Sequence, residues 1–509
     1  MADYDLAIIG GGINGAGIAR DVAGRGLRVI LLEQSDLASG TSSASTKLIH
    51  GGLRYLEHGA IRLVREALRE REVLLQLAPH IVRPLRFVLP AYPGPRSAVL
   101  LRIGLFLYDH LGGRKILPGT RTVDLTHSEV GAPLKRRYLS GFEYSDCWVD
   151  DARLVVLNAM DAHERGASIR TRTRVTRAER GEEWKLILNA EGRREVVTAR
   201  ALVNAAGPWA GIVADSVLRM PGPAPVRLIK GSHIVVPKLF RHDRGYIFQN
   251  DDQRIVFALP FHDDFTMTGP TALNFSGDLA APAPSAEEID YLRRAAGAYF
   301  REEIGETVWA FAGVRALYDD GEGKPEDITR EYHLDLDQRF REAPLLTVYG
   351  GKITTYRKLA EAALAKLAPF FRLHGPWTAR APLPGGDFLW DGVEARVTQA
   401  LHTWPFLTQR EAHRLVSAYG TRIERVLGAA ESAEDLGPRF GPISAVEVLY
   451  LVKNEWVRTA DDVIWRRSKL GLRMSKDETA SLERFIAGAV LPPPAMAEDE
   501  SDEETGVTT

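Results

Sequence analysis

The sequence of 509 residues contains one cysteine, Cys147, and almost no net charge. A single thiol excludes an intramolecular disulfide framework and is typical of a reducing compartment, so we expect Cys147 to be buried and unreactive. Because 65 Lys and Arg residues are balanced by 67 Asp and Glu residues, the formal net charge is −2. General nucleic-acid binding usually requires a basic surface, and we therefore predict a cytoplasmic protein that binds no nucleic acid.

The sequence also lacks an apolar run long enough to span a bilayer. The most apolar stretch, 98–111, contains Arg102 and Asp109 and is shorter than the roughly 20 residues of a transmembrane helix. It is either a helix packed inside a domain or a helix that lies on a membrane surface, and the sequence leaves both interpretations open. No signal peptide is expected, because a strand pattern begins almost at Met1. We find no internal repeats and expect no metal site.

The most informative segment is the beginning of the chain. Residues 6–9 have the pattern of a buried strand and run into Gly10-Gly11-Gly12-Ile13-Asn14-Gly15. A helical pattern follows, and a second strand, 27–32, ends at Glu33. A strand, a glycine turn, a helix and a strand with an acid at its tip form the layout that binds a dinucleotide.

Each residue type in this layout has a physical role. Gly10 permits the tight turn, Gly12 lets the backbone approach a pyrophosphate, and Gly15 lets the helix pack closely on the strand. The N-terminus of the helix offers N–H groups and a partial positive charge to the phosphates. Glu33 can accept hydrogen bonds from a ribose 2′-hydroxyl and would repel a 2′-phosphate, which disfavours NADP.

The length predicts two or three domains. Two further strand–turn patterns of the nucleotide domain lie at 199–209 and 345–352, and the alternating residues of 226–271 indicate a half-exposed sheet between them. By analogy, a nucleotide domain interrupted by inserted sheets is more typical of FAD enzymes than of NAD dehydrogenases. Helical periodicity predicts helices at 61–77, 150–165, 286–301 and 355–371, and a helical region that ends near 490.

These patterns predict an α/β fold with a discontinuous Rossmann-like FAD-binding domain, an inserted antiparallel-sheet substrate domain and a C-terminal helical domain. The expected boundaries are 1–80, 148–225 and 336–380 for the FAD-binding domain, 81–147 and 226–335 for the substrate domain, 381–490 for the helical domain, and 491–509 for a disordered acidic tail.

Several long motifs follow the N-terminal turn in a fixed order. They are STKLIHGGLRY at 45–55, NAAGPW at 204–209, KGSH at 230–233, GVR at 313–315, YGGKITTYRK at 349–358 and EWVRTADD at 455–462. On these motifs the chain closely resembles the FAD-dependent glycerol-3-phosphate dehydrogenases of the aerobic bacterial and mitochondrial type, over nearly its whole length.

The resemblance implies a reaction and its surroundings. The secondary alcohol of sn-glycerol 3-phosphate would be oxidised to dihydroxyacetone phosphate, with the hydride passing to flavin N5 and the electrons continuing to membrane quinone. No second glycine fingerprint of comparable quality occurs, so a nicotinamide cofactor is not expected to reoxidise the flavin. The resemblance also implies peripheral attachment to the inner face of the cell membrane and allows a homodimer.

The resemblance assigns roles to residues at the matching positions of the family. The substrate is a dianion, so cationic side chains must hold its phosphate, and Arg54 and Arg315 are the predicted ligands. A base must take the hydroxyl proton, and His50 and His233 are both candidates because histidine titrates near neutral pH. Arg315 can also stabilise the developing alkoxide whichever histidine acts.

Two more residues complete the predicted catalytic group. Tyr55 is interpreted as a hydrogen-bond donor to the substrate, with core packing as the alternative. Lys352 lies in the turn before the helix that Thr354 and Thr355 open, where it would stabilise the negative charge of the reduced flavin together with the helix N-terminus.

The predicted cofactor-binding residues come from separate segments of the chain. They are Gly10, Gly12, Asn14, Gly15 and Glu33; Thr41, Ser42, Ser45, Thr46, Lys47, Leu48 and Ile49; Val175; Ala206, Gly207 and Trp209; and Gly351, Lys352 and Thr354.

One segment departs from the family. Where its members usually have Gly-Thr-Thr-Asp, this chain has Gly269-Pro270-Thr271-Ala272, so a carboxylate and a hydroxyl are missing and the proline removes a backbone donor. Contacts from this loop are therefore not carried over, and the affinity for substrate can differ.

Three alternative functions remain open on the sequence. A glycerol-3-phosphate oxidase would pass electrons to oxygen, and an amine or amino-acid oxidase would use Arg54 and Arg315 to hold a carboxylate. A non-catalytic FAD-binding protein is the third, and the density of polar motifs around the flavin argues against it.

Overall fold

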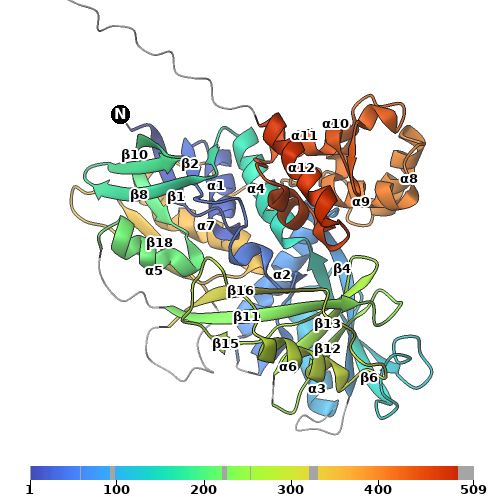
Figure 1. The fold of residues 1–509 in the computed structure, drawn as a ribbon. Helices are drawn as coiled ribbons and strands as arrows, with labels where there is room; N and C mark the ends of the chain where they lie inside the picture. The colour runs from blue at the N-terminus through green and yellow to red at the C-terminus, as the bar shows by residue number, and fades with distance from the viewer. Residues whose placement is uncertain are drawn as a thin grey trace, which may run out of the picture.

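The computed structural model describes residues 2–57, 59–91, 98–220, 226–252, 254–319 and 331–490. Figure 1 shows one layered sheet at the upper left, a second sheet below it, and a group of helices from the C-terminal part of the chain at the upper right. The predicted acidic tail, 491–509, lies outside the described residues.

The first sheet assembles strands from distant parts of the chain. Its order is β17-β18-β10-β1-β2-β7, in which the neighbours from β18 to β7 pair in parallel and β17 is antiparallel to β18. Because β1, β10 and β18 are adjacent and parallel, the turns that follow them meet at one edge, where α/β sheets bind ligands. The strands are β1 (Tyr4–Ile9), β2 (Val29–Leu32), β7 (Ser168–Arg170), β10 (Arg193–Asn204), β17 (His333–Asp337) and β18 (Leu345–Tyr349).

A layer covers each face of the first sheet. In β1, Leu6 and Ile8 enter one hydrophobic core and Ala7 and Ile9 enter the other, because successive strand residues point to opposite faces. The first core contains α1 (Ile13–Gly24), α4 (Asp151–Glu164) and α7 (Tyr356–Leu367). The second core is closed by an antiparallel meander of β8 (Thr173–Arg180), β9 (Trp184–Ala190) and the start of β10.

The second sheet has the order β15-β11-β14-β13-β12-β4-β6-β3, with β16 added to β11 and β5 to β6. The pair β4–β12 is parallel and the other pairs are antiparallel. One face packs against α6 (Ala286–Gly297) and the other against α2 (Ile61–Leu77) and α3 (Ala98–Leu111). The strands are β3 (Leu48–Ile49), β4 (Val82–Ala91), β5 (Arg121–Asp124), β6 (Ser140–Val149), β11 (Val226–Pro237), β12 (Gly245–Gln249), β13 (Ile255–Phe261), β14 (Phe265–Gly269), β15 (Leu273–Asn274) and β16 (Trp309–Tyr318).

The C-terminal part forms its own hydrophobic core. Two of its helices begin with capping boxes, in which Thr408 pairs with Glu411 and Ser475 pairs with Glu478. Its elements are α8 (Val393–Thr403), α9 (Gln409–Tyr419), α10 (Ile423–Leu427), the hairpin of β19 (Arg439–Phe440) and β20 (Ile443–Ser444), α11 (Ala445–Asn454), a π-helix (Asp462–Arg467) and α12 (Lys476–Ala489).

The predicted fold class is confirmed by this arrangement, and α2 has the bounds that helical periodicity predicts. Three expected domain assignments differ in detail from the structure. The boundary between residues 335 and 336 falls inside β17 of the first sheet, and the boundary between 147 and 148 falls inside β6 of the second sheet. In addition, β3 belongs to the second sheet although the sequence predicts 48–49 in the FAD-binding domain. The helix predicted to reach residue 301 ends at Gly297, because Phe300 forms a bridge with Leu134 instead.

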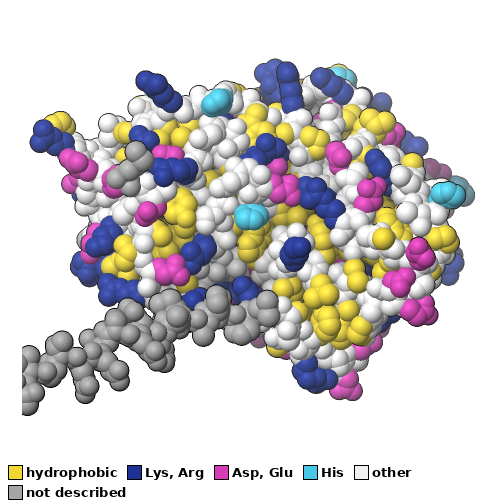
Figure 2. Space-filling model, turned by 90° about the horizontal axis from the view of Figure 1, so that it is seen from above, with side chains coloured by type: hydrophobic (Ala, Val, Ile, Leu, Met, Phe, Trp, Pro, Cys, Tyr) yellow, Lys and Arg dark blue, Asp and Glu magenta, His cyan; other side chains and the backbone are white. Residues whose placement is uncertain are grey.

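The surface carries both signs of charge. Figure 2 shows the face that lies at the top of Figure 1, where Lys and Arg alternate with Asp and Glu over the first sheet and the C-terminal helices. Within the described residues, no helix combines the length and the apolar character that crossing a membrane requires.

Candidate functional site

The glycine turn after β1 has the close approaches that a nucleotide-binding turn requires. Gly10 has a φ of 113°, and a Cβ atom there would lie 2.6 Å from the carbonyl oxygen of Ala205. A Cβ atom on Gly15 would lie 1.9 Å from the carbonyl oxygen of Gly10, so larger residues would push α1 off the strand. Gly12 is the N-cap of α1 and supplies no side-chain cap, which leaves the helix start suited to a phosphate.

Glu33 lies at the tip of β2, directly beside this turn. Its carboxylate accepts hydrogen bonds from the N–H of Gly11 at 2.7 Å and from the N–H of Ser35 at 2.8 Å. Burial raises the pKa of Glu33, although the N–H groups of Ser35 and Gly11 oppose the shift. The acid predicted to bind a ribose is therefore held where the turn and β2 meet.

The segment 41–55 connects the two sheets. The hydroxyl of Thr41 donates to the carbonyl oxygen of Val314 on β16, and the hydroxyl of Ser42 accepts from the N–H of Ile13 at the start of α1, at 3.0 Å. The segment thus crosses from the glycine turn to the second sheet, as a loop that closes over a flat cofactor would do.

Lys47 has a different environment from the one that its predicted cofactor role suggests. Its ammonium group lies 2.7 Å from Asp151 and donates to the carbonyl oxygen of Ser43, and the Lys47 and Asp151 side chains are 1% and 0% exposed. Ser45 donates through its N–H and its hydroxyl to the same carboxylate. These two polar side chains hold the segment against α4, so a contact of Lys47 with the cofactor would come from its backbone.

His233 is buried next to this segment. Its Nε2 atom lies 3.0 Å from the hydroxyl of Thr46, and its ring stacks on Phe311 with 4.9 Å between centroids. Burial, together with the positive charges of Lys47 and Arg315, lowers the pKa of His233 to about 3. The imidazole is therefore neutral at physiological pH and carries a lone pair.

Arg315 lies beside the segment that departs from the family. A Cβ atom on Gly231 would be 3.3 Å from the guanidinium of Arg315 and 3.6 Å from the Cβ atom of Pro270. The hydroxyl of Thr271 donates to Glu288 at 2.8 Å and accepts from the N–H of Ser232 at 2.9 Å. Thr271 is thus a structural residue here, whereas Pro270 lines the space next to Arg315.

A second group of predicted residues meets at the turn after β18. The backbone N–H of His50 lies 3.3 Å from the hydroxyl of Thr354, and the Lys352 ammonium lies over the ring of Tyr55, 3.9 Å from its centroid. Arg54 lies on the same single helical turn as Tyr55, Leu53–Leu56. His50 therefore lies against Thr354 and Tyr55 against Lys352, and Arg54 is part of the same helical turn as Tyr55.

The other predicted cofactor residues lie along the same edge of the first sheet or in its core. Asn14 donates to the carbonyl oxygen of Gly350 at 3.1 Å, which connects the glycine turn to the turn after β18. A Cβ atom on Gly40 would lie 3.1 Å from the ring of Trp209, so the turn after β10 covers the loop after β2. Val175 is a buried member of the core between the sheet and the meander.

The C-terminal domain contacts the loop that follows Glu33. Both oxygens of Asp36 accept hydrogen bonds from Arg467, at 2.7 and 2.8 Å, and Arg466 donates to the same carboxylate at 2.6 Å. Asp462, at the end of the last family motif, lies 2.6 Å from Arg172 beside β7. That motif therefore serves the contact between the helical domain and the first sheet.

Sequence reasoning missed Asp151, which holds the predicted residues Ser45 and Lys47 in place. It also missed two carboxylates that fix the surroundings: Asp36, which binds Arg466 and Arg467, and Glu288, which binds Ser232 and Thr271. Glu288 has a local signature, since it forms a capping box with Ser285, but its contacts with Ser232 and Thr271 are not local. Asp36 and Asp151 have ordinary sequence contexts and distant partners: Lys47 and Asp151 are separated by 104 residues. Local patterns carry no signal for such pairs.

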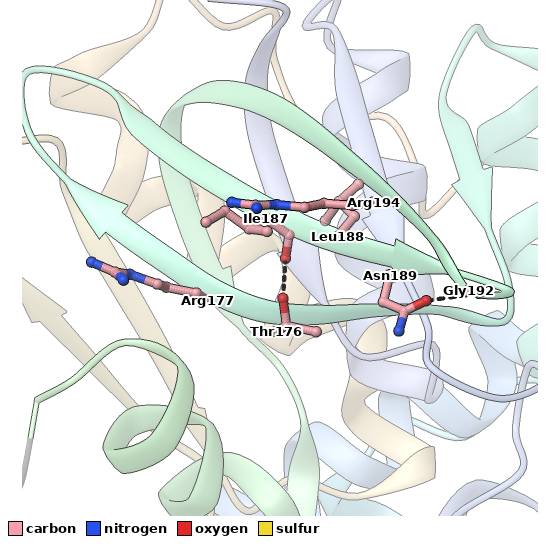
Figure 3. Close-up of a pocket in the computed structure, with 7 residues that line it drawn as sticks. All are labelled: Thr176, Arg177, Ile187, Leu188, Asn189, Gly192 and Arg194. Carbon is pink, nitrogen blue, oxygen red and sulfur yellow. Dashed lines mark hydrogen bonds between the residues drawn. The ribbon is translucent and has the colours of Figure 1, made fainter.

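A surface cavity of about 330 Å³ lies elsewhere, on the antiparallel meander of the first sheet (Figure 3). In the close-up, Arg177 and Arg194 extend along the strands and Thr176 donates to the carbonyl oxygen of Ile187. None of the predicted site residues is among the described residues that line it, so this cavity is not the candidate site.

Comparisons with known proteins identify the family. The profile described as FAD dependent oxidoreductase matches residues 5–357, and that of the C-terminal domain of alpha-glycerophosphate oxidase matches 376–489. The chain is 53% identical over 489 residues to a glycerol-3-phosphate dehydrogenase of Pseudomonas aeruginosa, a match that covers 95% of each chain. The chain belongs to the FAD-dependent glycerol-3-phosphate dehydrogenase family.

Within this family the substrate named for relatives varies. A D-erythritol 1-phosphate dehydrogenase of Brucella abortus is 48% identical over 494 residues, covering 96% of this chain and 98% of the relative. The solved structure of the glycerol-3-phosphate dehydrogenase of Bacillus halodurans with FAD has a TM-score of 0.72 at 24% identity, covering 96% of this chain and 94% of that one. The fold is therefore that of an FAD-dependent oxidoreductase, and FAD is the cofactor.

Proposed function

We propose that this protein oxidises sn-glycerol 3-phosphate to dihydroxyacetone phosphate and passes the electrons to membrane quinone. The observation that supports the proposal is the segment 41–55, which runs beside the glycine turn and contacts two groups of predicted residues. Thr46 contacts His233 in the first group, and in the second the backbone of His50 contacts Thr354 and the ring of Tyr55 contacts Lys352.

Phosphate recognition falls to Arg54 and Arg315. A guanidinium presents parallel donors that fit two oxygens of a phosphate, which a lysine cannot do. Arg315 is exposed, and Pro270 beside it has no backbone N–H to donate to the phosphate, so Arg315 itself must supply the donors there. Both arginines would bind the phosphate of the substrate before hydride transfer and thereby orient its alcohol group.

His233 is the candidate to accept the hydroxyl proton. Its low pKa means that the ring is already neutral, so that no proton has to be removed before it acts. The negative charge of a bound phosphate would offset the repulsion of Lys47 and Arg315 and raise the basicity of the ring. His50, whose backbone is fixed by Thr354, is the second candidate.

When bound, FAD supplies the hydride acceptor at flavin N5. Lys352 would stabilise the negative charge of the reduced flavin. A cation–π contact with the ring of Tyr55 would hold its ammonium group in position. The alcohol loses its C–H hydrogen as hydride and its O–H hydrogen as a proton, so the product is the ketone.

A longer polyol phosphate is the second candidate substrate. The relative named D-erythritol 1-phosphate dehydrogenase matches over nearly the whole chain. Pro270 and Ala272 also replace the hydroxyl and carboxylate that the family usually places in the loop next to Arg315. With fewer polar groups beside Arg315, this loop imposes fewer hydrogen-bonding requirements on the bound substrate.

Peripheral attachment to the inner face of the cell membrane is supported by α3. Its outward face carries apolar side chains that are between 45% and 68% exposed: Val99, Leu100, Ile103, Phe106 and Leu107. The exposed Arg102 on the same helix supplies positive charge. An apolar stripe together with arginine is typical of a helix that lies in a membrane interface and meets anionic lipid.

The decisive experiment is anaerobic reduction of the bound flavin. sn-Glycerol 3-phosphate, D-erythritol 1-phosphate and glycine are each mixed with the purified holoenzyme, and the flavin absorbance band is followed by stopped flow. We expect rapid bleaching by glycerol 3-phosphate, whereas preferential bleaching by erythritol phosphate supports the second candidate. Bleaching by glycine alone, or by none of the three, would refute both.

Reoxidation then distinguishes the acceptors. The reduced enzyme is mixed either with a water-soluble quinone or with oxygen, and hydrogen peroxide is assayed in the second case. We expect fast reoxidation by the quinone and little peroxide. Fast reoxidation by oxygen with one peroxide for each flavin would identify an oxidase.

A further inference from the structure

We propose that Tyr108 is a positioning residue for the catalytic segment 50–55, acting through a hydrogen bond to the backbone of Gly51. The inference rests on the proposed function, since it assumes that this segment faces the substrate. Tyr108 belongs to α3, which none of the family motifs includes.

The hydroxyl of Tyr108 joins the catalytic segment to a buried ion pair. It accepts the N–H of Gly51 at 2.7 Å, and it lies 2.8 and 2.9 Å from the two carboxylate oxygens of Asp146. Arg71 lies 2.7 Å from Asp146 and donates to the carbonyl oxygen of Ser145 at 2.7 Å. The same hydroxyl thus accepts a hydrogen bond from the backbone N–H of Gly51 and donates one to the carboxylate of Asp146.

The ion pair between Arg71 and Asp146 holds the hydroxyl of Tyr108 in a fixed orientation. Tyr108, Asp146 and Arg71 are each no more than 3% exposed, so water does not compete for their hydrogen bonds. Burial, together with the neighbouring Asp146, raises the pKa of Tyr108, and the hydroxyl therefore stays protonated as a donor to Asp146. Its oxygen is left to accept the N–H of Gly51.

The ring of Tyr108 fixes the same backbone by contact. A Cβ atom on Gly51 would lie 2.8 Å from the ring of Tyr108 and 2.6 Å from Leu68 on α2. The next residue, Gly52, has a φ of 76°, and a Cβ atom there would lie 2.2 Å from the ring of Tyr55. The chain therefore turns tightly at this point, with α2 and α3 on one side and Tyr55 on the other.

This turn determines where the predicted catalytic side chains are. His50 comes directly before Gly51, and Arg54 and Tyr55 follow Gly52 on one helical turn. Thr354 fixes the segment at His50, and Tyr108 fixes it one residue later. Loss of the second attachment would leave His50 anchored and allow Arg54 and Tyr55 to shift relative to it, and a misplacement of about 1 Å can cost about 100-fold in rate.

The test variant is Tyr108→Phe, which keeps the ring and removes the hydroxyl. Tyr144→Phe is the matched control, because Tyr144 is also buried and packs edge-on against Tyr108 with 5.8 Å between centroids. No contact of Tyr144 with the segment 50–55 is recorded among the described residues. Both variants are purified as holoenzymes, and FAD content, Tm, the rate of anaerobic flavin reduction and hydrogen–deuterium exchange of peptides that cover 50–56 are measured.

We expect Tyr108→Phe to bind FAD in full and to reduce it roughly tenfold or more slowly, with faster exchange in 50–56. Tyr144→Phe should match the wild type in both measurements. Wild-type reduction rates in Tyr108→Phe, equal losses in the two variants, or slower reduction without faster exchange would each overturn the proposal, because a residue that only packs would give one of these results.

The wild-type protein supplies a measurement that does not depend on the folding of a variant. The Gly51 amide must exchange slowly, because its acceptor is buried, and exchange at the rate of an exposed loop would overturn the proposal. If the wild-type holoenzyme is not bleached by a polyol phosphate, the proposed function fails. The exchange measurements then still decide whether Tyr108 holds the segment.

Discussion

In the proposed mechanism, phosphate binding and alkoxide stabilisation both depend on Arg315. Its guanidinium lies beside Gly231 and Pro270, and its charge is close enough to His233 to lower the pKa of that ring. Removing it would weaken the hold on the phosphate, and it would also take away positive charge where the alkoxide develops. The two losses act on the same transition state.

We predict that Arg315→Ala retains FAD and loses about 100- to 1000-fold in kcat/KM, as expected when a charged group at the reacting centre is removed. Steady-state kinetics with an artificial electron acceptor, together with the flavin content, measure this. Arg177→Ala is the control, because Arg177 forms a surface ion pair with Glu179 and lines the unrelated cavity on the meander. Unchanged turnover in Arg315→Ala would remove this residue from the mechanism.

At the scale of elements, α3 has two different faces. Tyr108 and Leu105 point into the core against the second sheet, whereas Phe106 and Leu107 are exposed. In Figure 1, α3 lies at the bottom of the molecule, opposite the face of mixed charge that Figure 2 shows. The apolar face is therefore set apart from the C-terminal helices and can approach a lipid surface without them.

Replacing Phe106 by Ser should weaken attachment to vesicles that contain anionic lipid. Burial of a phenylalanine side chain contributes about 1.5–3 kcal/mol, so we expect the partition coefficient to fall roughly tenfold or more in a flotation assay. The matched control is Phe340→Ser, at an 89% exposed phenylalanine between β17 and β18. Equal partitioning of the Phe106→Ser variant and the wild type would exclude α3 as the attachment face.

The sequence predicts best those elements whose conformation is determined by residues close together in the chain. The turn at Gly10 and the bounds of α2 follow from residue type and periodicity within short windows. The partners that position the site are not local, since the bond between Gly51 and Tyr108 joins residues 57 apart and involves an ordinary-looking tyrosine. The role of Lys47 is the clearest case, because its motif predicts a cofactor contact while its ammonium group pairs with Asp151.

At the scale of the whole molecule, His80, which lies between α2 and β4, contacts the connection to the C-terminal domain. A Cβ atom on Gly385 would lie 3.4 Å from its Nε2 atom, and Phe388 lies 6.3 Å away between ring centroids. Burial, together with the charge of Arg153, lowers the pKa of His80 to about 3. Neither ring nitrogen has a hydrogen-bond partner among the described residues.

This environment makes the fold sensitive to acid. A histidine that stays neutral in the folded state takes up a proton on unfolding once the pH is below its usual pKa of about 6.5. Stability is therefore present above this pH and is lost as the pH falls towards 3, by about 1.4 kcal/mol for each pH unit and histidine. His233, with a pKa also near 3, adds to the same trend.

We predict that His80→Gln reduces the fall in Tm between pH 7 and pH 5, because a side chain that does not titrate removes one of the protons taken up on unfolding. The difference between the two pH values is the measured quantity, so a uniform loss of stability in the variant cancels. His127→Gln is the control, since its side chain is 86% exposed. If His80→Gln shows the same fall in Tm as the wild type and as His127→Gln, His80 does not couple protonation to the junction of the domains.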